Sequence, residues 1–198
     1  MEMRMTTILI VDDNPDLVEL FSLVLTHKGY STLTASGCEA CIEILKTSIP
    51  DLILLDIMME PLDGWETLKK LKNDVLTKSL PVIMLTGKPP SWEEVVAHMD
   101  DIEDYVIKPL TMQGLSDLVQ GFFNRQDAIT RECSIAKTQG ADGAILDEYR
   151  QIRRSLIAGK TMLNVLGQPK ESVEKVLRMR QERLLVLQHQ FQIPHAGP

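Results

Sequence analysis

Short apolar runs alternate with amphipathic helical segments through the first two thirds of this 198-residue chain. Five runs rich in branched side chains are typical of strands, at residues 7–11, 31–34, 51–56, 81–85 and 104–107. Helical spacing of apolar residues follows each run, at residues 15–28, 36–47, 64–72, 91–99 and 111–123. Continuously apolar strands joined by helices indicate a parallel sheet that is covered on both faces. The pattern therefore predicts a doubly wound α/β fold.

Polar residues stand where these predicted strands end. The set comprises Asp12 and Asp13 after the first strand, Asp56 after the third, Thr86 after the fourth and Lys108 after the fifth. Because the carboxyl ends of parallel strands meet at one edge of a sheet, we expect these side chains to lie together. Three neighbouring carboxylates repel one another unless a cation lies among them, and Mg²⁺ suits such an oxygen-rich site. A carboxylate beside Mg²⁺, an ammonium and a hydroxyl is suited to accepting a phosphoryl group.

Five motifs give the chain a specific resemblance to the receiver domain of two-component response regulators, over residues 6–123. They are ILIVDD at residues 8–13, DLILLDIMM at 51–59, LDG at 62–64, PVIMLTG at 81–87 and DYVIKP at 104–109. The resemblance implies a five-stranded parallel sheet in the order 2-1-3-4-5 with five helices. It also implies a sensor histidine kinase as the partner that supplies the phosphoryl group.

The same resemblance implies a role for each residue of the predicted phosphorylation site. Asp56 is the phosphoacceptor. Asp12 and Asp13 hold Mg²⁺ together with Asp56, and the backbone carbonyl of Met58 completes the protein ligands. Mn²⁺ is the alternative ion.

Three further residues are implied to act as a switch. Lys108 contacts the phosphoryl group and is followed by a cis peptide bond to Pro109. Thr86 moves to bond the phosphoryl oxygens, and Tyr105 then swings inward to fill the space that Thr86 leaves. This movement would carry a local change of charge to a surface of the domain.

One position departs from the receiver pattern. Glu60 stands four residues after Asp56, where receivers usually have proline, and Pro61 comes one residue later. We expect the extra carboxylate beside the predicted metal site to alter the affinity for Mg²⁺ or for the kinase. Because the proline is displaced by one residue, the receiver pattern does not predict the conformation of this loop. The stretch at residues 59–65 resembles archaeal receivers.

The cysteines and the apolar runs exclude several classes of protein. Cys38 and Cys41 form a CxxC motif, but no second ligand pair follows, so a structural role is favoured over zinc or redox chemistry. The longest apolar runs, at residues 8–11 and 52–55, are too short to cross a bilayer. The first residues lack the apolar stretch of a signal peptide, so we expect a cytoplasmic protein without membrane insertion.

The formal charge divides the chain into two parts. Residues 1–124 carry 9 basic and 20 acidic residues, a net charge of −11, whereas residues 125–198 carry 12 and 8, a net charge of +4. Such a split indicates two modules with different tasks. We expect a receiver domain at 1–124, a linker at 125–141, and a helical output or dimerisation segment at 142–198. The helical spacing of residues 111–123 continues weakly through Ile129 and Ile135 until Gly140 breaks it.

Apolar residues in the last segment recur three and four positions apart in two stretches, separated by Gly167-Gln168-Pro169. The pattern predicts a helical hairpin, which has an apolar face left to pack against a second copy, the receiver or a partner. Over few residues and without a sharp motif, this hairpin resembles the HalX-type output segments of archaeal regulators. Eight basic residues lie on it, at positions 150, 153, 154, 160, 175, 178, 180 and 183.

These observations favour a response regulator whose phosphorylated receiver controls transcription through dimerisation of the hairpin or its docking to a protein of the transcription machinery. Direct DNA binding by the basic hairpin is one alternative, since basic helices can follow phosphates, although no helix-turn-helix pattern is present. A phosphate shuttle or sink with a structural tail is another. We expect no enzymatic activity beyond Mg²⁺-dependent self-phosphorylation and self-dephosphorylation.

Overall fold

A computed structural model describes residues 5–166 and 171–193 of the chain. These residues form two compact units. The first unit contains the described residues up to Pro89 together with Asp101–Leu118, and the second contains Pro90–Asp100 together with the described residues from Val119 onward. The expected turn at Gly167-Gln168-Pro169 lies outside the described residues.

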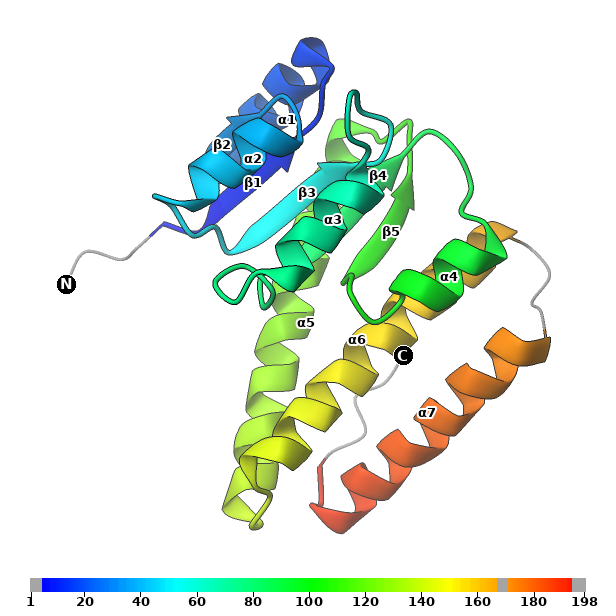
Figure 1. Cartoon of the computed structure of the whole chain (residues 1–198). Coiled ribbons are helices and arrows are strands. Elements are labelled where there is room, and N and C mark those ends of the chain that lie inside the picture. The colour runs from blue at the N-terminus through cyan, green and yellow to red at the C-terminus, as the bar shows by residue number, and fades with distance from the viewer. Residues whose placement is uncertain (1–4, 167–170, 194–198) are drawn as a thin grey trace. The chain divides into compact units, whose positions relative to one another are not determined.

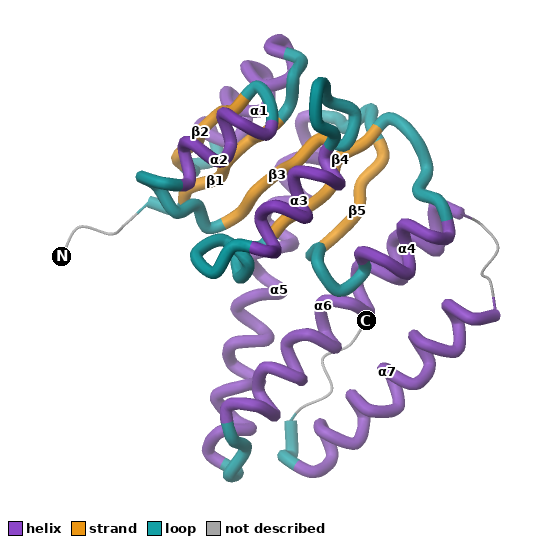
Figure 2. Tube along the Cα trace, viewed as in Figure 1, coloured by secondary structure: helices purple, strands orange, loops and turns teal. Residues whose placement is uncertain are grey.

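A parallel sheet forms the centre of the first unit (Figure 2). Its strands are β1 (Thr7–Val11), β2 (Ser31–Ala35), β3 (Leu52–Asp56), β4 (Val82–Thr86) and β5 (Asp104–Ile107). They pair in the order β2-β1-β3-β4-β5, and every pairing is parallel. The strand order that the sequence analysis predicted is therefore confirmed.

Three helices of the first unit connect the strands, namely α1 (Pro15–His27), α2 (Cys38–Leu45) and α3 (Gly64–Asn73). Helices α2 and α3 lie in front of the sheet and α1 lies behind it in Figure 1. Asn14 caps α1, because its side chain accepts hydrogen bonds from two backbone N–H groups of the first turn. Asp63 and Glu66 cap α3 reciprocally, each side chain accepting from the other residue's backbone N–H.

The central strands explain why the sheet is stable. Every residue of β3 and β4 is buried, and so is β1 from Ile8 onward. Branched and aliphatic side chains on both faces of a strand bury apolar area against the helices on either side. Cys38 and Cys41 belong to this packing as buried free thiols on α2. Burial is the main cause that raises the pKa of Cys41 to about 12, and the nearby Cys38 adds to it.

The described residues of the second unit form helices and the loops between them. Its helices are α4 (Trp92–His98), the greater part of α5 (Met112–Thr138), α6 (Gly143–Leu166) and α7 (Glu171–Gln190). Helices α6 and α7 pack as a pair, as the predicted hairpin requires. The side chain of Leu177 on α7 packs directly against Gly159 on α6, where an added Cβ would lie 2.7 Å from a methyl carbon of Leu177.

Helix α5 continues well beyond Phe123, where the sequence analysis ended it. It runs unbroken to Thr138, so most of the stretch expected to be a linker is helical. The physical reason is that no proline or glycine interrupts residues 122–138, and Ile129, Cys133 and Ala136 are buried at helical spacing. The domain boundaries themselves stay a prediction.

A buried polar cluster joins the last three helices. Glu132 on α5 accepts a hydrogen bond from the Tyr149 hydroxyl at 3.0 Å and forms an ion pair with Arg153 at 3.2 Å. Gln188 on α7 donates to the same hydroxyl at 3.5 Å. Burial raises the pKa of Tyr149 to about 12, which keeps its hydroxyl protonated as a donor. The cluster favours one register of the three helices, because any other register would leave these groups unpaired.

None of the described helices is long and apolar enough to cross a membrane.

Removing Glu132 tests how much this buried cluster stabilises the second unit. In the Glu132→Ala variant, Arg153 would lose its carboxylate while its side chain is only 15% exposed. We expect the free energy of unfolding to fall by about 3 kcal/mol, measured by denaturant titration. Asp147→Ala is the matched control, since it breaks the exposed ion pair with Arg150 and should cost about 0.5 kcal/mol. Equal losses in the two variants would contradict a stabilising role of the buried cluster.

Candidate functional site

The strand order gathers four of the predicted side chains at the carboxyl edge of the sheet. Strand β1 ends one residue before Asp12, β3 ends at Asp56, and β4 ends at Thr86. Lys108 follows β5 directly. Although these residues are far apart in the chain, the parallel pairing of the four strands brings them to one place.

The Lys108 ammonium is the centre of the site. Its Nζ lies 2.5 Å from Oδ2 of Asp12 and 2.9 Å from Oδ1 of Asp56. The Asp12 and Asp56 side chains are only 4% and 5% exposed, so both ion pairs are shielded from water. The other oxygen of Asp12 accepts a hydrogen bond from the backbone N–H of Asn14, which holds the carboxylate in place.

These surroundings shift the acidity of both partners. Burial raises the pKa of the Asp56 carboxyl, and the nearby Asp12 carboxylate raises it further, while Lys108 opposes them through its hydrogen bond and charge. Burial alone would lower the pKa of Lys108, but the hydrogen bonds to Asp12 and Asp56 outweigh it, and the pKa lies above the ordinary value. The ammonium therefore stays charged, and a further cation beside Asp56 would favour its ionised form.

Asp13 completes a group of carboxylates that fits a divalent cation. One oxygen each of Asp12, Asp13 and Asp56 lie within 4.8 Å of one another, and Asp13 opens to solvent. Hard oxygen ligands on one side and access to water on the other suit Mg²⁺, which usually keeps several waters. The residues present therefore fit a divalent metal ion, as the sequence analysis expected.

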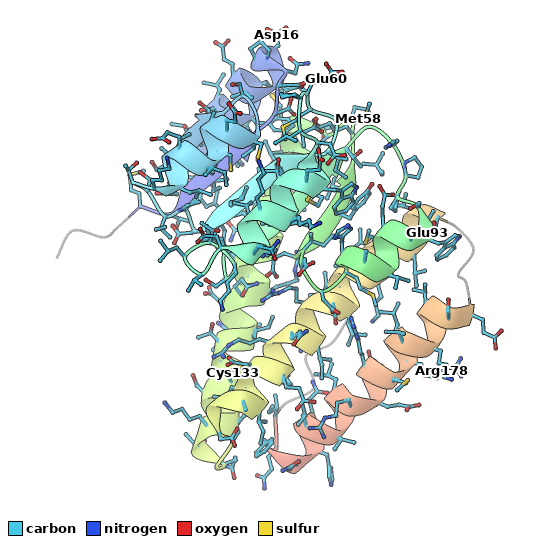
Figure 3. All side chains as sticks on the ribbon, in the orientation of Figure 1. Asp16, Met58, Glu60, Glu93, Cys133 and Arg178 are labelled. Carbon is cyan, nitrogen blue, oxygen red and sulfur yellow. The ribbon has the colours of Figure 1, made fainter. Side chains whose placement is uncertain are left out.

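The loop after β3 borders this group. Figure 3 labels Met58 and Glu60, the residue predicted to lend its carbonyl to the metal and the residue that departs from the receiver pattern. Met58 has an exposed side chain, and the peptide bond from Glu60 to Pro61 is cis. The bond from Lys108 to Pro109 is also cis, as the resemblance implied.

Thr86 and Tyr105, the two predicted switch residues, are both buried. Thr86 is fully buried, and its hydroxyl oxygen accepts a hydrogen bond from the backbone N–H of Lys88 at 3.3 Å. Tyr105 is 1% exposed, and its hydroxyl donates to the backbone carbonyl of Lys88 at 3.2 Å. Lys88 thus joins the two residues through its main chain.

The sequence analysis missed one neighbour of this pair. The ring of Trp65 stacks on the ring of Tyr105, with centroids 6.2 Å apart and planes inclined by 18°. The LDG motif directly before Trp65 was recognised only as one of the motifs that carry the resemblance to receivers. Nothing in the spacing of the residues indicated that this ring would reach β5.

Comparison with known proteins agrees with this geometry. The family model of the response regulator receiver domain matches residues 8–120, more than half of the chain. The chain belongs to this family. Response regulator receivers are not a family of catalytic enzymes, in agreement with the expectation from the sequence.

Several curated relatives of this receiver are transcriptional regulators. The alkaline phosphatase synthesis transcriptional regulatory protein PhoP of Bacillus subtilis is 33% identical over 139 residues, covering 70% of this chain and 57% of that protein. The phosphate regulon transcriptional regulatory protein PhoB of Pseudomonas aeruginosa is 36% identical, covering 55% of this chain and 48% of that protein. The chain thus spans about half the length of the curated relatives it matches.

Solved structures show the same fold over the receiver. The N-terminal domain of a response regulator receiver protein from Methanoculleus marisnigri is 48% identical and covers 58% of this chain and 94% of that chain, with a TM-score of 0.51. A two-component response regulator from Clostridium difficile is 30% identical and covers 61% of this chain and 98% of that chain, with a TM-score of 0.55.

Gly64 offers a test of how tightly the receiver site is built. An added Cβ at this position would lie 2.2 Å from the carbonyl oxygen of Asp56 and 2.7 Å from the Cα of Ile57. Both atoms belong to the backbone, so Gly64→Ala should force the end of β3 away from α3. We expect the free energy of unfolding to fall by about 2 kcal/mol, measured by chemical denaturation.

Gly143→Ala is the control for this variant, because nothing lies within 4 Å of the added carbon at the start of α6. It should leave stability unchanged or raise it slightly. If Gly64→Ala were as well tolerated as the control, the contact between α3 and the end of β3 would not be as close as described.

Proposed function

We propose that this chain is a two-component response regulator, in which Asp56 accepts a phosphoryl group from a histidine kinase and thereby switches the C-terminal helices. Receiver domains pair with histidine kinases, and the family match covers the whole strand-end site. The observation that carries the proposal is the buried Asp56 carboxylate, 2.9 Å from the Lys108 ammonium and beside the carboxylates of Asp12 and Asp13. A cytoplasmic location follows from the partner kinase and is part of the proposal.

The geometry supports a role for each of these residues in the proposed transfer. A carboxylate oxygen of Asp56 forms the new O–P bond as the P–N bond of the kinase phosphohistidine breaks, and the leaving imidazole takes up a proton from water. Lys108 stabilises charge on the phosphoryl oxygens with its fixed ammonium. Asp12, Asp13 and Asp56, with the Met58 carbonyl, would hold Mg²⁺ or Mn²⁺. The ion supplies further neutralisation of the phosphoryl charge.

Labelling with acetyl phosphate in the presence of Mg²⁺ tests the assignment of the acceptor. The wild-type protein should gain the mass of a phosphoryl group, measured by intact-mass spectrometry, and Asp56→Asn should gain none, because an amide oxygen is a poor nucleophile. Asp63→Asn is the control, since asparagine can still cap α3 and this residue is not among the metal-binding carboxylates. Full labelling of Asp56→Asn would show that the acceptor is another residue.

The path from the receiver site to the C-terminal helices is proposed to run through α4. The chain passes from Thr86 at the site into the short segment that leads to Trp92, the first residue of α4. Helix α4 itself belongs to the second compact unit and packs against α6. A movement of Thr86 would therefore pull on a helix that is already part of the C-terminal unit.

A bidentate ion pair connects Asp100, which lies two residues after α4, to Arg180 on α7. The guanidinium of Arg180 donates from both terminal nitrogens to the carboxylate of Asp100, at 2.6 and 2.8 Å. This bidentate arrangement fixes orientation as well as distance. We propose that it transmits movement of α4 to α7.

Arg183 provides a matched control for Arg180. It lies on the same helix and makes an equivalent bidentate pair, at 2.7 and 2.8 Å, but its partner is Glu148 on α6. Trypsin cleavage after the exposed Lys175 and Arg178 reports how firmly α7 is held. In wild type, beryllofluoride with Mg²⁺, a stable mimic of the phosphoryl group, should change the cleavage rate several-fold.

Trypsin should cleave Arg180→Gln faster than wild type, and beryllofluoride with Mg²⁺ should no longer change that cleavage rate. Arg183→Gln should keep the change in rate. A response that survives in Arg180→Gln would exclude the Asp100 pair as the route.

The surface of α7 supports dimerisation or protein docking as the output. Met179, Leu185 and Val186 are 60%, 45% and 52% exposed on this helix. Met179 and Val186 are seven residues apart and so lie on the same side of the helix, where exposed apolar side chains are typical of a contact surface. Control of transcription is proposed by analogy with the curated relatives, and the receiver, linker and output boundaries at 1–124, 125–141 and 142–198 stay part of the proposal.

The two alternative functions have less support. Four of the eight basic residues on the hairpin, Arg150, Arg153, Arg180 and Arg183, form ion pairs within the second unit. Such pairing lowers the positive charge that a DNA backbone would meet. A phosphate sink with a structural tail would need no connection between α4 and α7. It is the function that remains if phosphorylation of Asp56 does not change the structure or mobility of α7.

A further inference from the structure

A hydrogen bond and an aromatic stack are among the contacts that hold the Tyr105 side chain in its buried position. Its hydroxyl donates to the carbonyl oxygen of Lys88, and one face of its ring lies against Trp65. The hydrogen bond fixes the end of the side chain, and the stack fixes the plane of the ring. Together they define the position that the switch residue occupies in this structure.

We infer that Trp65 is a positioning residue for the switch, and that its stack with Tyr105 favours the buried position of the tyrosine ring. The inference rests on the proposed function, because it concerns regulation of the same phosphorylation site. It adds a residue from α3 to a switch otherwise formed by residues of β4 and β5.

The backbone around Trp65 is anchored to the phosphoacceptor strand. Gly64 packs so closely on the Asp56 carbonyl that no side chain would fit between them, and its N–H donates to the carbonyl of Ile57 at 2.9 Å. The reciprocal cap formed by Asp63 and Glu66 fixes the first turn of α3. The Trp65 side chain therefore starts from a point that is set by the end of β3.

The other end of the arrangement leads back to Thr86. The Tyr105 hydroxyl binds the Lys88 carbonyl, and the N–H of the same residue donates to the hydroxyl oxygen of Thr86. A tyrosine held by Trp65 thus favours one position of the main chain at Lys88, and with it one position of Thr86. Trp65 joins Asp56 to Thr86 by a route through aromatic packing that is separate from the phosphoryl group.

The size of the effect follows from the contact. An aromatic pair of this geometry shifts a two-state equilibrium by about two- to tenfold beyond what its buried area contributes. Trp65 is half-buried, so replacing it should not open a large cavity. The alternative is that Trp65 only covers apolar surface. In that case any apolar side chain of moderate size at this position would leave the position of Tyr105 unchanged.

Fluorine NMR of the full chain labelled with 3-fluorotyrosine tests this inference. The chain has three tyrosines, and Tyr149 and Tyr30 serve as buried and half-buried internal references. A soluble gadolinium chelate broadens the signal of a tyrosine in proportion to its exposure. In wild type, the Tyr105 signal should be protected like that of Tyr149.

Trp65→Leu keeps an apolar side chain but removes the aromatic face, and Trp65→Phe keeps a ring that can stack. We expect the chelate to broaden the Tyr105 signal about two- to tenfold more in the leucine variant and to leave the phenylalanine variant close to wild type. Labelling by acetyl phosphate should slow by a similar factor in the leucine variant alone. Beryllofluoride with Mg²⁺ should restore protection of Tyr105 in that variant.

Unchanged protection of Tyr105 in Trp65→Leu would overturn the inference, and so would equal loss of protection in both variants. If the Tyr149 signal shows that the leucine variant does not fold, Trp65→Met provides the same comparison. The proposed function fails separately: in that case acetyl phosphate would not label the wild-type protein, whatever the position of Tyr105.

Discussion

The contact of the Lys108 ammonium with Asp12 and Asp56 is the interaction on which the site depends. Two buried carboxylates at neighbouring strand ends would repel each other in a region of low dielectric constant. Lys108 lies between them at hydrogen-bonding distance and neutralises part of that charge. It reaches this place because β5 is parallel to β4, β3 and β1 and ends at the same edge of the sheet. The charge pattern of the site is thus a consequence of the strand order.

The same edge explains how a change of charge could act at a distance. The segment after Thr86 leads into α4, a short helix that belongs to the C-terminal compact unit. The chain therefore leads from the receiver site directly into a helix of the C-terminal unit, and the bidentate pair of Asp100 and Arg180 joins the segment after that helix to α7. The stacked rings of Trp65 and Tyr105 lie within the first unit, and the proposed role of Trp65 is to favour the buried position of Tyr105.

Much of this could be predicted from the sequence, and the reasons are physical. The strands and their terminal Asp, Thr and Lys residues follow from apolar runs whose ends are polar, and the parallel pairing follows from the helices between them. The strand order came from the resemblance to receiver domains. The length of α5 was underestimated, because the weak amphipathic signal at Ile129 and Cys133 competes with a polar composition. The Trp65 stack and the Asp100–Arg180 pair join residues that are distant in the chain, and neither has a local signature.

Hydrogen–deuterium exchange of the full chain, with and without beryllofluoride and Mg²⁺, tests the central claim most directly. The claim is that events at Asp56 reach the C-terminal helices through α4. It predicts that exchange changes in three places on activation: the segment after Thr86, helix α4 at residues 92–98, and helix α7 at residues 171–190. Changes confined to the loops around Asp56, with α4 and α7 exchanging as before, would contradict it and leave a receiver without this output.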